Sequence, residues 1–306
     1  MDAFSLIVIK LIPLYLIMLT GFLAGRFLSV SAETIANLLI YVISPVVYLG
    51  YVSTVPISIS TLSLPVLVFV LCTVMEVVFY FFSRLFFRDA TVNLVAVSAA
   101  TANSGYFGIP LFLLLFGDQD LGVYMLAITG MLIFQLTLGY YVIARGNFTV
   151  ADSLKKMLTL PPVYAVIIGV ILSVTHTSLP PVVVDMIGNF RSAYMVLGVM
   201  MIGLSIAGIR HFSIDWRYIS ITFFAKFLVW PLLVAIVIGA DRYMFRMFNP
   251  LIYNCLIILA VVPLLVDLVL FATQLRVEPE KAATGVFLST LFALVYIPVA
   301  CMLFIR

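Results

Sequence analysis

Ten apolar segments, each close to 20 residues long or longer, follow one another along this 306-residue chain with short connections between them. A helix that spans a membrane needs about 20 consecutive apolar residues. Only 9% of the residues are charged, whereas a soluble domain is usually about 25% charged. The sequence therefore predicts an all-α integral membrane protein with ten transmembrane helices. The expected spans are residues 3–25, 33–54, 62–83, 92–115, 120–144, 160–178, 181–208, 216–239, 250–274 and 281–304.

The basic residues of the loops predict how the chain is oriented. Cytoplasmic loops usually carry the excess of Lys and Arg. One set of loops holds Arg26, Arg84, Arg88, Arg145, Lys155, Lys156, Arg210, Arg217, Arg276 and Lys281, and the opposite side holds Arg191, Arg242, Arg246 and Arg306. We therefore expect a multi-pass protein of the cell inner (plasma) membrane, with both termini outside.

The longest polar connection divides the expected helices into two sets of five. The division predicts a first repeat over residues 1–145, a cytoplasmic linker over 146–159 and a second repeat over 160–306. Because five is an odd number, the second repeat enters the membrane from the other side and is inverted.

Two of the expected spans contain residues that interrupt a helix. The fourth holds Thr101-Ala-Asn-Ser-Gly-Tyr-Phe-Gly-Ile-Pro110, and the ninth holds Pro263. Proline lacks a backbone N–H and clashes with the preceding turn, while glycine permits unusual backbone angles. Backbone freed inside the bilayer is tolerated only where protein or a watery cavity covers it. Paired interruptions in matching segments point to the binding site of a transporter between broken crossover helices 4 and 9.

A shift of 153 residues, which aligns Pro110 with Pro263 (263 − 110), supports the repeat. The same shift superimposes Gly50 on Gly203, brings Glu76 within a turn of Lys226 and puts Thr101 opposite Asn254. In the first span, Gly21 and Gly25 have the spacing of a face on which two helices pack closely.

An anionic substrate is expected at the interruption in helix 4. Asn103 offers two donors and an acceptor, and the N-terminus of a half-helix attracts anions. The alternative is that Asn103 only caps the broken helix. The substrate-binding candidates are Asn103, Ser104, Thr101, Asn254, Gly105, Pro110 and Pro263.

Three ionisable side chains deep in the expected spans, Glu76, Lys226 and Asp267, are candidates for a coupling ion or proton. A charge at the centre of a bilayer costs at least about 2.5–3.5 kcal/mol, so it usually faces a cavity or a partner. Asp267 is either a proton or cation site or a structural acid bonded to freed backbone. Lys226 either neutralises a substrate carboxylate or pairs with Glu76 or Asp267. Arg191 is expected at the membrane interface rather than in contact with a ligand.

The sequence resembles the auxin efflux carrier family, in its bacterial branch of PIN-type transporters. The residues that carry the resemblance are Asn103-Ser-Gly-Tyr-Phe-Gly-Ile-Pro110, Phe116-Gly117, Leu160-Pro-Pro-Val, Gly203, Lys226, Pro231 and Pro263. It implies two inverted five-helix repeats and elevator-type alternating access for small organic anions, such as malate, malonate or auxin-like acids. The family often has Asn four residues after the helix 9 proline, where this chain has Asp267. A carboxylate at this position either repels an anion unless it is protonated or provides proton or cation coupling.

No enzymatic machinery is visible: the sequence has no Walker-A loop, no zinc-ligand spacing and no nucleophile elbow. We therefore expect no enzymatic activity, no metal and no cofactor other than H⁺ or Na⁺ as coupling ion. The expected partners are a small organic anion and the lipid bilayer, with a homodimer allowed; the net charge of +3 suggests no nucleic acid. Two alternatives stay open. One is a cation/proton exchanger or a sodium-coupled symporter of the bile-acid-symporter type, and the other is an anion sensor that does not transport.

Overall fold

The computed structural model describes residues 3–28, 30–54, 63–117, 120–208 and 214–304, and within these ranges every regular element is helical. Six of the described helices are long and apolar enough to cross a membrane, or seven if the bent pair Val150–Leu158 and Pro161–Val174 forms one span. The all-α membrane protein is thus confirmed. The ten-span pattern is not confirmed, partly because the expected spans 92–115 and 250–274 are each divided into two shorter helices.

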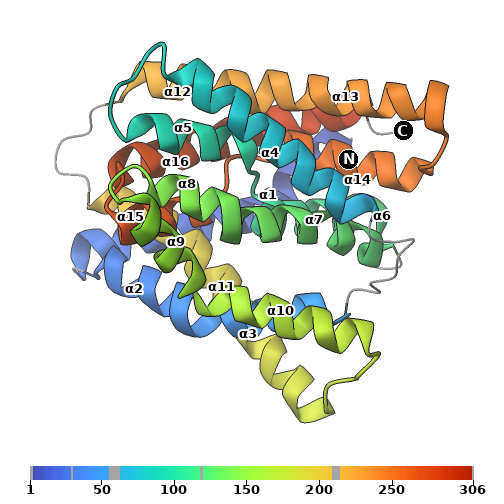
Figure 1. Ribbon diagram of the computed structural model, residues 1–306, viewed down its shortest axis with the longest axis horizontal. Helices are drawn as coiled ribbons and strands as arrows, with labels where there is room; N and C mark the ends of the chain where they lie inside the picture. Colours follow the sequence, from blue (N-terminus) through green and yellow to red (C-terminus); the bar gives the residue numbers. More distant parts are fainter. Residues whose placement is uncertain (1–2, 29, 55–62, 118–119, 209–213, 305–306) are drawn as a thin grey trace.

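Five helices pack into one group, which we call the panel. Its members are α1 (Ala3–Phe27), α2 (Ala32–Leu38), α3 (Ser44–Thr54), α10 (Pro161–Val174) and α11 (Pro181–Ala207). Helix α1 packs along α11, and α3 packs along α10 and α11. Figure 1 shows α2, α3, α10 and α11 along the lower edge of the molecule.

Glycines allow α1 and α11 to approach closely. A Cβ atom on Gly21 would lie 2.1 Å from the carbonyl oxygen of Met200, and one on Gly203 would lie 2.0 Å from that of Met18. The expectation of a close-packing face at Gly21 and Gly25 is confirmed, because a Cβ on Gly25 would also lie only 2.7 Å from that of Ala207.

Most of the remaining helices form a second group, which we call the bundle. Its members are α4 (Ser63–Ser83), α5 (Thr91–Ala100), α6 (Ile109–Phe116), α7 (Leu121–Phe134), α8 (Tyr140–Ala144), α12 (Trp216–Phe224), α13 (Trp230–Ala240), α14 (Pro250–Val261), α15 (Asp267–Leu275) and α16 (Pro279–Phe304). Helix α4 packs on α5 and α7, and α14 packs on α7 and α13. Helix α9 (Val150–Leu158), in the expected linker, packs on α8. Thr149 caps its N-terminus, because the Thr149 hydroxyl accepts a hydrogen bond from the Asp152 N–H. Both groups therefore combine helices from the two halves of the chain.

Lys281 ties three connections of the bundle together at one end. Its ammonium lies 3.4 Å from Asp215, 3.2 Å from Glu278 and 3.8 Å from Asp89, and it donates a 2.6 Å hydrogen bond to the Thr91 hydroxyl. Partial burial acts to raise the pKa of Asp89, but hydrogen bonds from Thr91 and the Lys281 ammonium hold this pKa below its usual range. The ends of α4, α5, α12 and α16 are thereby joined.

Candidate functional site

The helix of the fourth expected span is interrupted at residues 101–103. Helix α5 ends at Ala100, Thr101 is extended with φ −115° and ψ 165°, and a π-helical turn over Ser104–Gly108 leads into α6. Asn103, expected just before the break, therefore lies inside it. Pro110 does not make the break: it is the second residue of α6, after the π-helical turn and well past the extended segment.

The ninth span is interrupted at the predicted proline. Helix α14 ends at Val261, α15 begins at Asp267, and Pro263 lies in the irregular segment between them. The two breaks meet, because the Asn103 N–H donates a 2.9 Å hydrogen bond to the Pro263 carbonyl oxygen. Ser289 of α16 accepts a 3.2 Å hydrogen bond from the Leu264 N–H. Backbone freed by the breaks thus finds partners within the protein, as an apolar surrounding requires.

The π-helical turn Ala225–Val229 and the start of α13 contact the ends of both broken helices. The Lys226 ammonium donates a 2.9 Å hydrogen bond to the carbonyl of Leu259 in α14, and the Trp230 indole donates one of 2.6 Å to the carbonyl of Ala99 in α5. Both donors are fully buried. The last carbonyls of a helix lack partners within the helix and attract cations, so these two side chains stabilise both helix ends.

The structure does not show the ion pairs expected for Lys226. Within the described part of the chain, Lys226 forms no salt bridge with Glu76 or Asp267, because its ammonium is directed at the Leu259 carbonyl. Glu76 is buried, and its Oε1 atom has no hydrogen-bond partner among the described residues.

Asp267 is held by donors from three helical segments. Its Oδ2 accepts hydrogen bonds from the hydroxyls of Tyr48 and Tyr194, both at 3.0 Å, and from the Gln135 amide at 3.2 Å. The Tyr194 hydroxyl also lies 3.1 Å from Oδ1 and 2.8 Å from the Tyr48 hydroxyl. All four side chains are buried. Asp267 also occupies the first turn of α15, where the helix dipole favours a negative charge.

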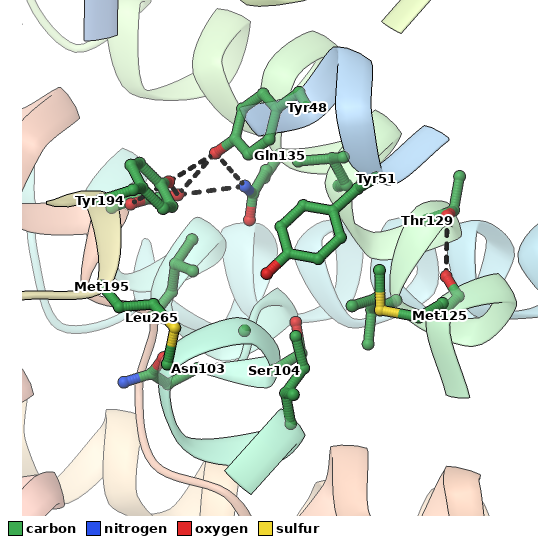
Figure 2. Close-up of a pocket in the computed structure, with 15 residues that line it drawn as sticks. Tyr48, Tyr51, Asn103, Ser104, Met125, Thr129, Gln135, Tyr194, Met195 and Leu265 are labelled. Carbon is green, nitrogen blue, oxygen red and sulfur yellow. Dashed lines mark hydrogen bonds between the residues drawn. The ribbon is translucent and has the colours of Figure 1, made fainter. Parts of the chain in front are cut away.

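A pocket with an empty volume of about 600 Å³, its open mouth included, lies between the panel and the meeting point of the two breaks. Figure 2 shows Tyr48, Gln135 and Tyr194 joined by hydrogen bonds on one side of it, and Asn103 and Ser104 on the other. Of the described residues that line it, Asp267 alone carries a formal charge. The remaining lining residues are Tyr51, Gly105, Ile109, Met125, Ile128, Thr129, Leu132, Met195 and Leu265.

A second, narrower cavity lies on the other side of the Asp267 cluster and shares Tyr48, Tyr194 and Asp267 with the first; its empty volume is about 240 Å³, its opening included. Its other lining residues are Ile40, Ser44, Leu136, Leu160, Pro162, Leu270 and Phe271. The first pocket lies toward the C-terminal end of α3, because Tyr51 lines it. The second lies toward α2 and the connection that carries Lys155 and Lys156, because Ile40 and Leu160 line it. The hydrogen-bonded cluster separates the two cavities.

The structure brings some of the predicted substrate-binding residues together and leaves others apart. Asn103, Ser104 and Gly105 line the first pocket. Thr101 is buried with its hydroxyl bonded to the Val97 carbonyl, and Asn254 lies along α14; neither lines the pocket. Pro263 contributes its carbonyl to the contact between the breaks, and the side chain of Pro110 lies outside the described residues.

Several polar residues that line the pocket are not among the predicted site residues. Tyr48 and Tyr51 lie three residues apart on α3, and Arg191 and Tyr194 lie three apart on α11. Such spacing puts each pair on one helix face. The Tyr48 and Tyr194 rings meet edge to face at 5.9 Å, and the Arg191 guanidinium lies 4.6 Å from the centre of the Tyr51 ring. Arg191, expected at the interface, thus lies against a residue of the pocket wall. The i, i+3 spacing is the sequence signal that could have placed these side chains on a common helix face.

A helical membrane protein with a pocket where two interrupted helices meet has the form of a membrane transporter. Residues 6–301 match the family described as membrane transport protein, the auxin efflux carrier family, and the chain belongs to this family. It is 24% identical, over 309 aligned residues, to an uncharacterized transporter of Methanocaldococcus jannaschii, an alignment that covers 97% of this chain and 96% of that protein. The resemblance seen in the sequence is confirmed, and the chain is a multi-pass membrane transport protein.

Proposed function

We propose that this protein is a secondary active transporter of small organic anions, which bind in the pocket beside Asn103. The observation that carries the proposal is the place of this pocket, where the breaks in α5–α6 and α14–α15 meet. The half-helix that starts at Ser104 and the half-helix α15 both begin at the pocket wall. Helix N-termini favour anions, and the Asn103 amide adds two donors for a carboxylate.

Alternating access would arise from movement of the bundle against the panel, in the manner of an elevator. Most of the helix packing lies within one group or the other, which supports two units that move separately. The two units meet where α16 packs on α1 and α11 and where α2 packs on α15. Each unit draws helices from both halves of the chain, as expected for ten helices in two inverted repeats over residues 1–145 and 160–306. The basic loops would face the cytoplasm, in accord with the distribution of Lys and Arg.

A coupling proton or Na⁺ would use a buried carboxyl group. Asp267, where the bundle meets Tyr48 of the panel, and Glu76 on α4 each have under 5% of their surface exposed. Because Asp267 is the one formally charged residue among the described pocket residues, a cation/proton exchanger or sodium-coupled symporter is the second candidate function. An anion sensor without transport is the third.

Uptake by proteoliposomes tests the proposal. Mono- and dicarboxylates would be supplied at two pH values, with and without Na⁺. A hydrogen bond to a charged group contributes about 1.5–3 kcal/mol, so Asn103→Ala should lower uptake at subsaturating substrate about 10- to 100-fold. Asn254→Ala is the matched control, because Asn254 is an amide on a broken helix outside the pocket.

Undiminished uptake by Asn103→Ala would refute the role of this residue. Proton or cation flux that does not depend on organic anions and is lost in the Asp267→Asn variant would favour the exchanger. Saturable binding without any flux would identify a sensor.

A further inference from the structure

The hydrogen bonds of the Asp267 cluster divide according to the helix group that supplies each partner. Tyr48 on α3 and Tyr194 on α11 belong to the panel, and their hydroxyls lie 2.8 Å apart. Gln135 and Asp267 belong to the bundle and are joined at 3.2 Å. If the panel and the bundle each move as a unit, the hydrogen bond within each of these two pairs is kept.

The contacts between these pairs cross from the panel to the bundle. They are the hydrogen bonds from Tyr48 to Asp267, from Tyr194 to Asp267 and from Gln135 to Tyr48, at 3.0 to 3.4 Å. A hydroxyl has one proton to donate, so two phenols can supply the carboxylate with two hydrogen bonds, and Gln135 adds its amide protons. Movement of the bundle along the panel must break all three contacts.

The same cluster forms the wall between the two cavities. Tyr48, Tyr194 and Asp267 line the pocket beside Asn103 on one side and the smaller cavity beside Ser44 on the other. With the cluster intact, Ser44 is only 4% exposed. A passage from one cavity to the other therefore leads through these side chains.

We propose that Tyr48 and Tyr194 form the gate of the transport pathway, and that Asp267 is the latch that holds the gate shut in this conformation. The proposal rests on the proposed transport function and assigns to it two residues of the panel. The panel tyrosines hold the Asp267 carboxylate while the pocket beside Asn103 is formed. When the bundle moves, the carboxylate leaves the tyrosine pair, and the cavity beside Ser44 becomes accessible.

Thiol labelling of a cysteine in the second cavity tests the gate without a substrate. Ser44→Cys is a small change at a buried position, and the three native cysteines are also buried, so the parent protein provides the background rate. The purified full-length protein would be treated with a hydrophilic methanethiosulfonate reagent. Tyr48→Phe and Tyr194→Phe together remove both hydroxyls and keep both rings.

In the Ser44→Cys protein with both tyrosines replaced, labelling should be at least about tenfold faster, which corresponds to a shift of about 1.4 kcal/mol in the gate equilibrium. Tyr296→Phe is the matched control, because this hydroxyl donates to the Phe227 carbonyl within the bundle. It should leave the labelling rate unchanged. If the double variant does not fold, Asp267→Asn takes its place, since it keeps the side-chain shape and removes the charge that the phenols hold.

An unchanged labelling rate in a variant that melts at the parent temperature would overturn the gate, as would equal acceleration by Tyr296→Phe. Failure of the transport function is distinguishable, because the labelling assay contains no substrate. Normal anion uptake with unchanged labelling refutes the gate alone. Accelerated labelling without uptake of any anion refutes the transport proposal and still shows a closure between the two cavities.

Discussion

The backbone N–H of Asn103 and the carbonyl oxygen of Pro263 are joined by a hydrogen bond of 2.9 Å, which links the break in one helix to the break in another. Each break supplies what the other lacks, a donor on one side and an acceptor on the other. An unsatisfied polar group in an apolar environment costs several kcal/mol, so the two irregular segments are stable together. The pocket exists because neither segment continues as a helix.

Ser289 should matter for the stability of the second break. Ser289→Ala leaves the buried Leu264 N–H without its acceptor and should lower the free energy of unfolding by about 1–3 kcal/mol. Thermal unfolding of the purified protein measures this. Ser192→Ala is the control, since this exposed hydroxyl donates only to the Gly188 carbonyl of its own helix. Equal melting temperatures for the two variants would contradict the prediction.

Trp230 should be needed for its indole N–H as well as for its bulk. Trp230→Phe keeps an aromatic ring but leaves the Ala99 carbonyl at the end of α5 without its donor. We expect a loss of about 1–3 kcal/mol in stability together with reduced transport, because the end of α5 positions Asn103. Trp216→Phe, at an exposed position, should change neither quantity. Wild-type melting and uptake for Trp230→Phe would show that the hydrogen bond is dispensable.

Gly21 should tolerate no side chain, because a Cβ would overlap the Met200 carbonyl of α11. Overpacking typically costs about 1–3 kcal/mol, so Gly21→Ala should lower the melting temperature of the protein. Gly188→Ala is the comparison: a Cβ there meets no atom within 4 Å, and alanine is the better helix former. A Gly21→Ala protein as stable as Gly188→Ala would mean that α1 and α11 separate at little cost.

Arg191 should raise the affinity of the pocket for anions through its charge. Its guanidinium lies against Tyr51, and a partly screened charge at such a site contributes on the order of 1 kcal/mol. Arg191→Gln should therefore raise the KM for an anionic substrate about fivefold, with less effect at high ionic strength. Arg242→Gln removes a similar Arg–Tyr stack, at 4.9 Å from Tyr253, outside the pocket. Equal effects of both substitutions would indicate that only the surface charge matters.

Local sequence features predicted the parts of the site that depend on local chemistry. Pro263 interrupts its helix because it has no N–H, and Asn103 lies in the partner break. The position of that break was predicted less well: the glycines and Pro110 are accommodated in a π-helical turn and the first turn of α6, and the extended residues precede them. The acid pairing considered for Lys226 is not seen among the described residues. A buried ammonium suggests an acid, whereas this one is bonded to a helix end.

The sequence by itself determined that this protein lies in a membrane as a set of apolar helices, since hydrophobic length is a property of consecutive residues. It also indicated that two of these helices are interrupted. Only the tertiary structure decided which side chains close the pocket. Tyr48, Gln135 and Tyr194 carry no charge, and in the sequence they resemble ordinary packing residues. Their role follows from hydrogen bonds to Asp267 that join distant parts of the chain, and such geometry is set by how the helices pack.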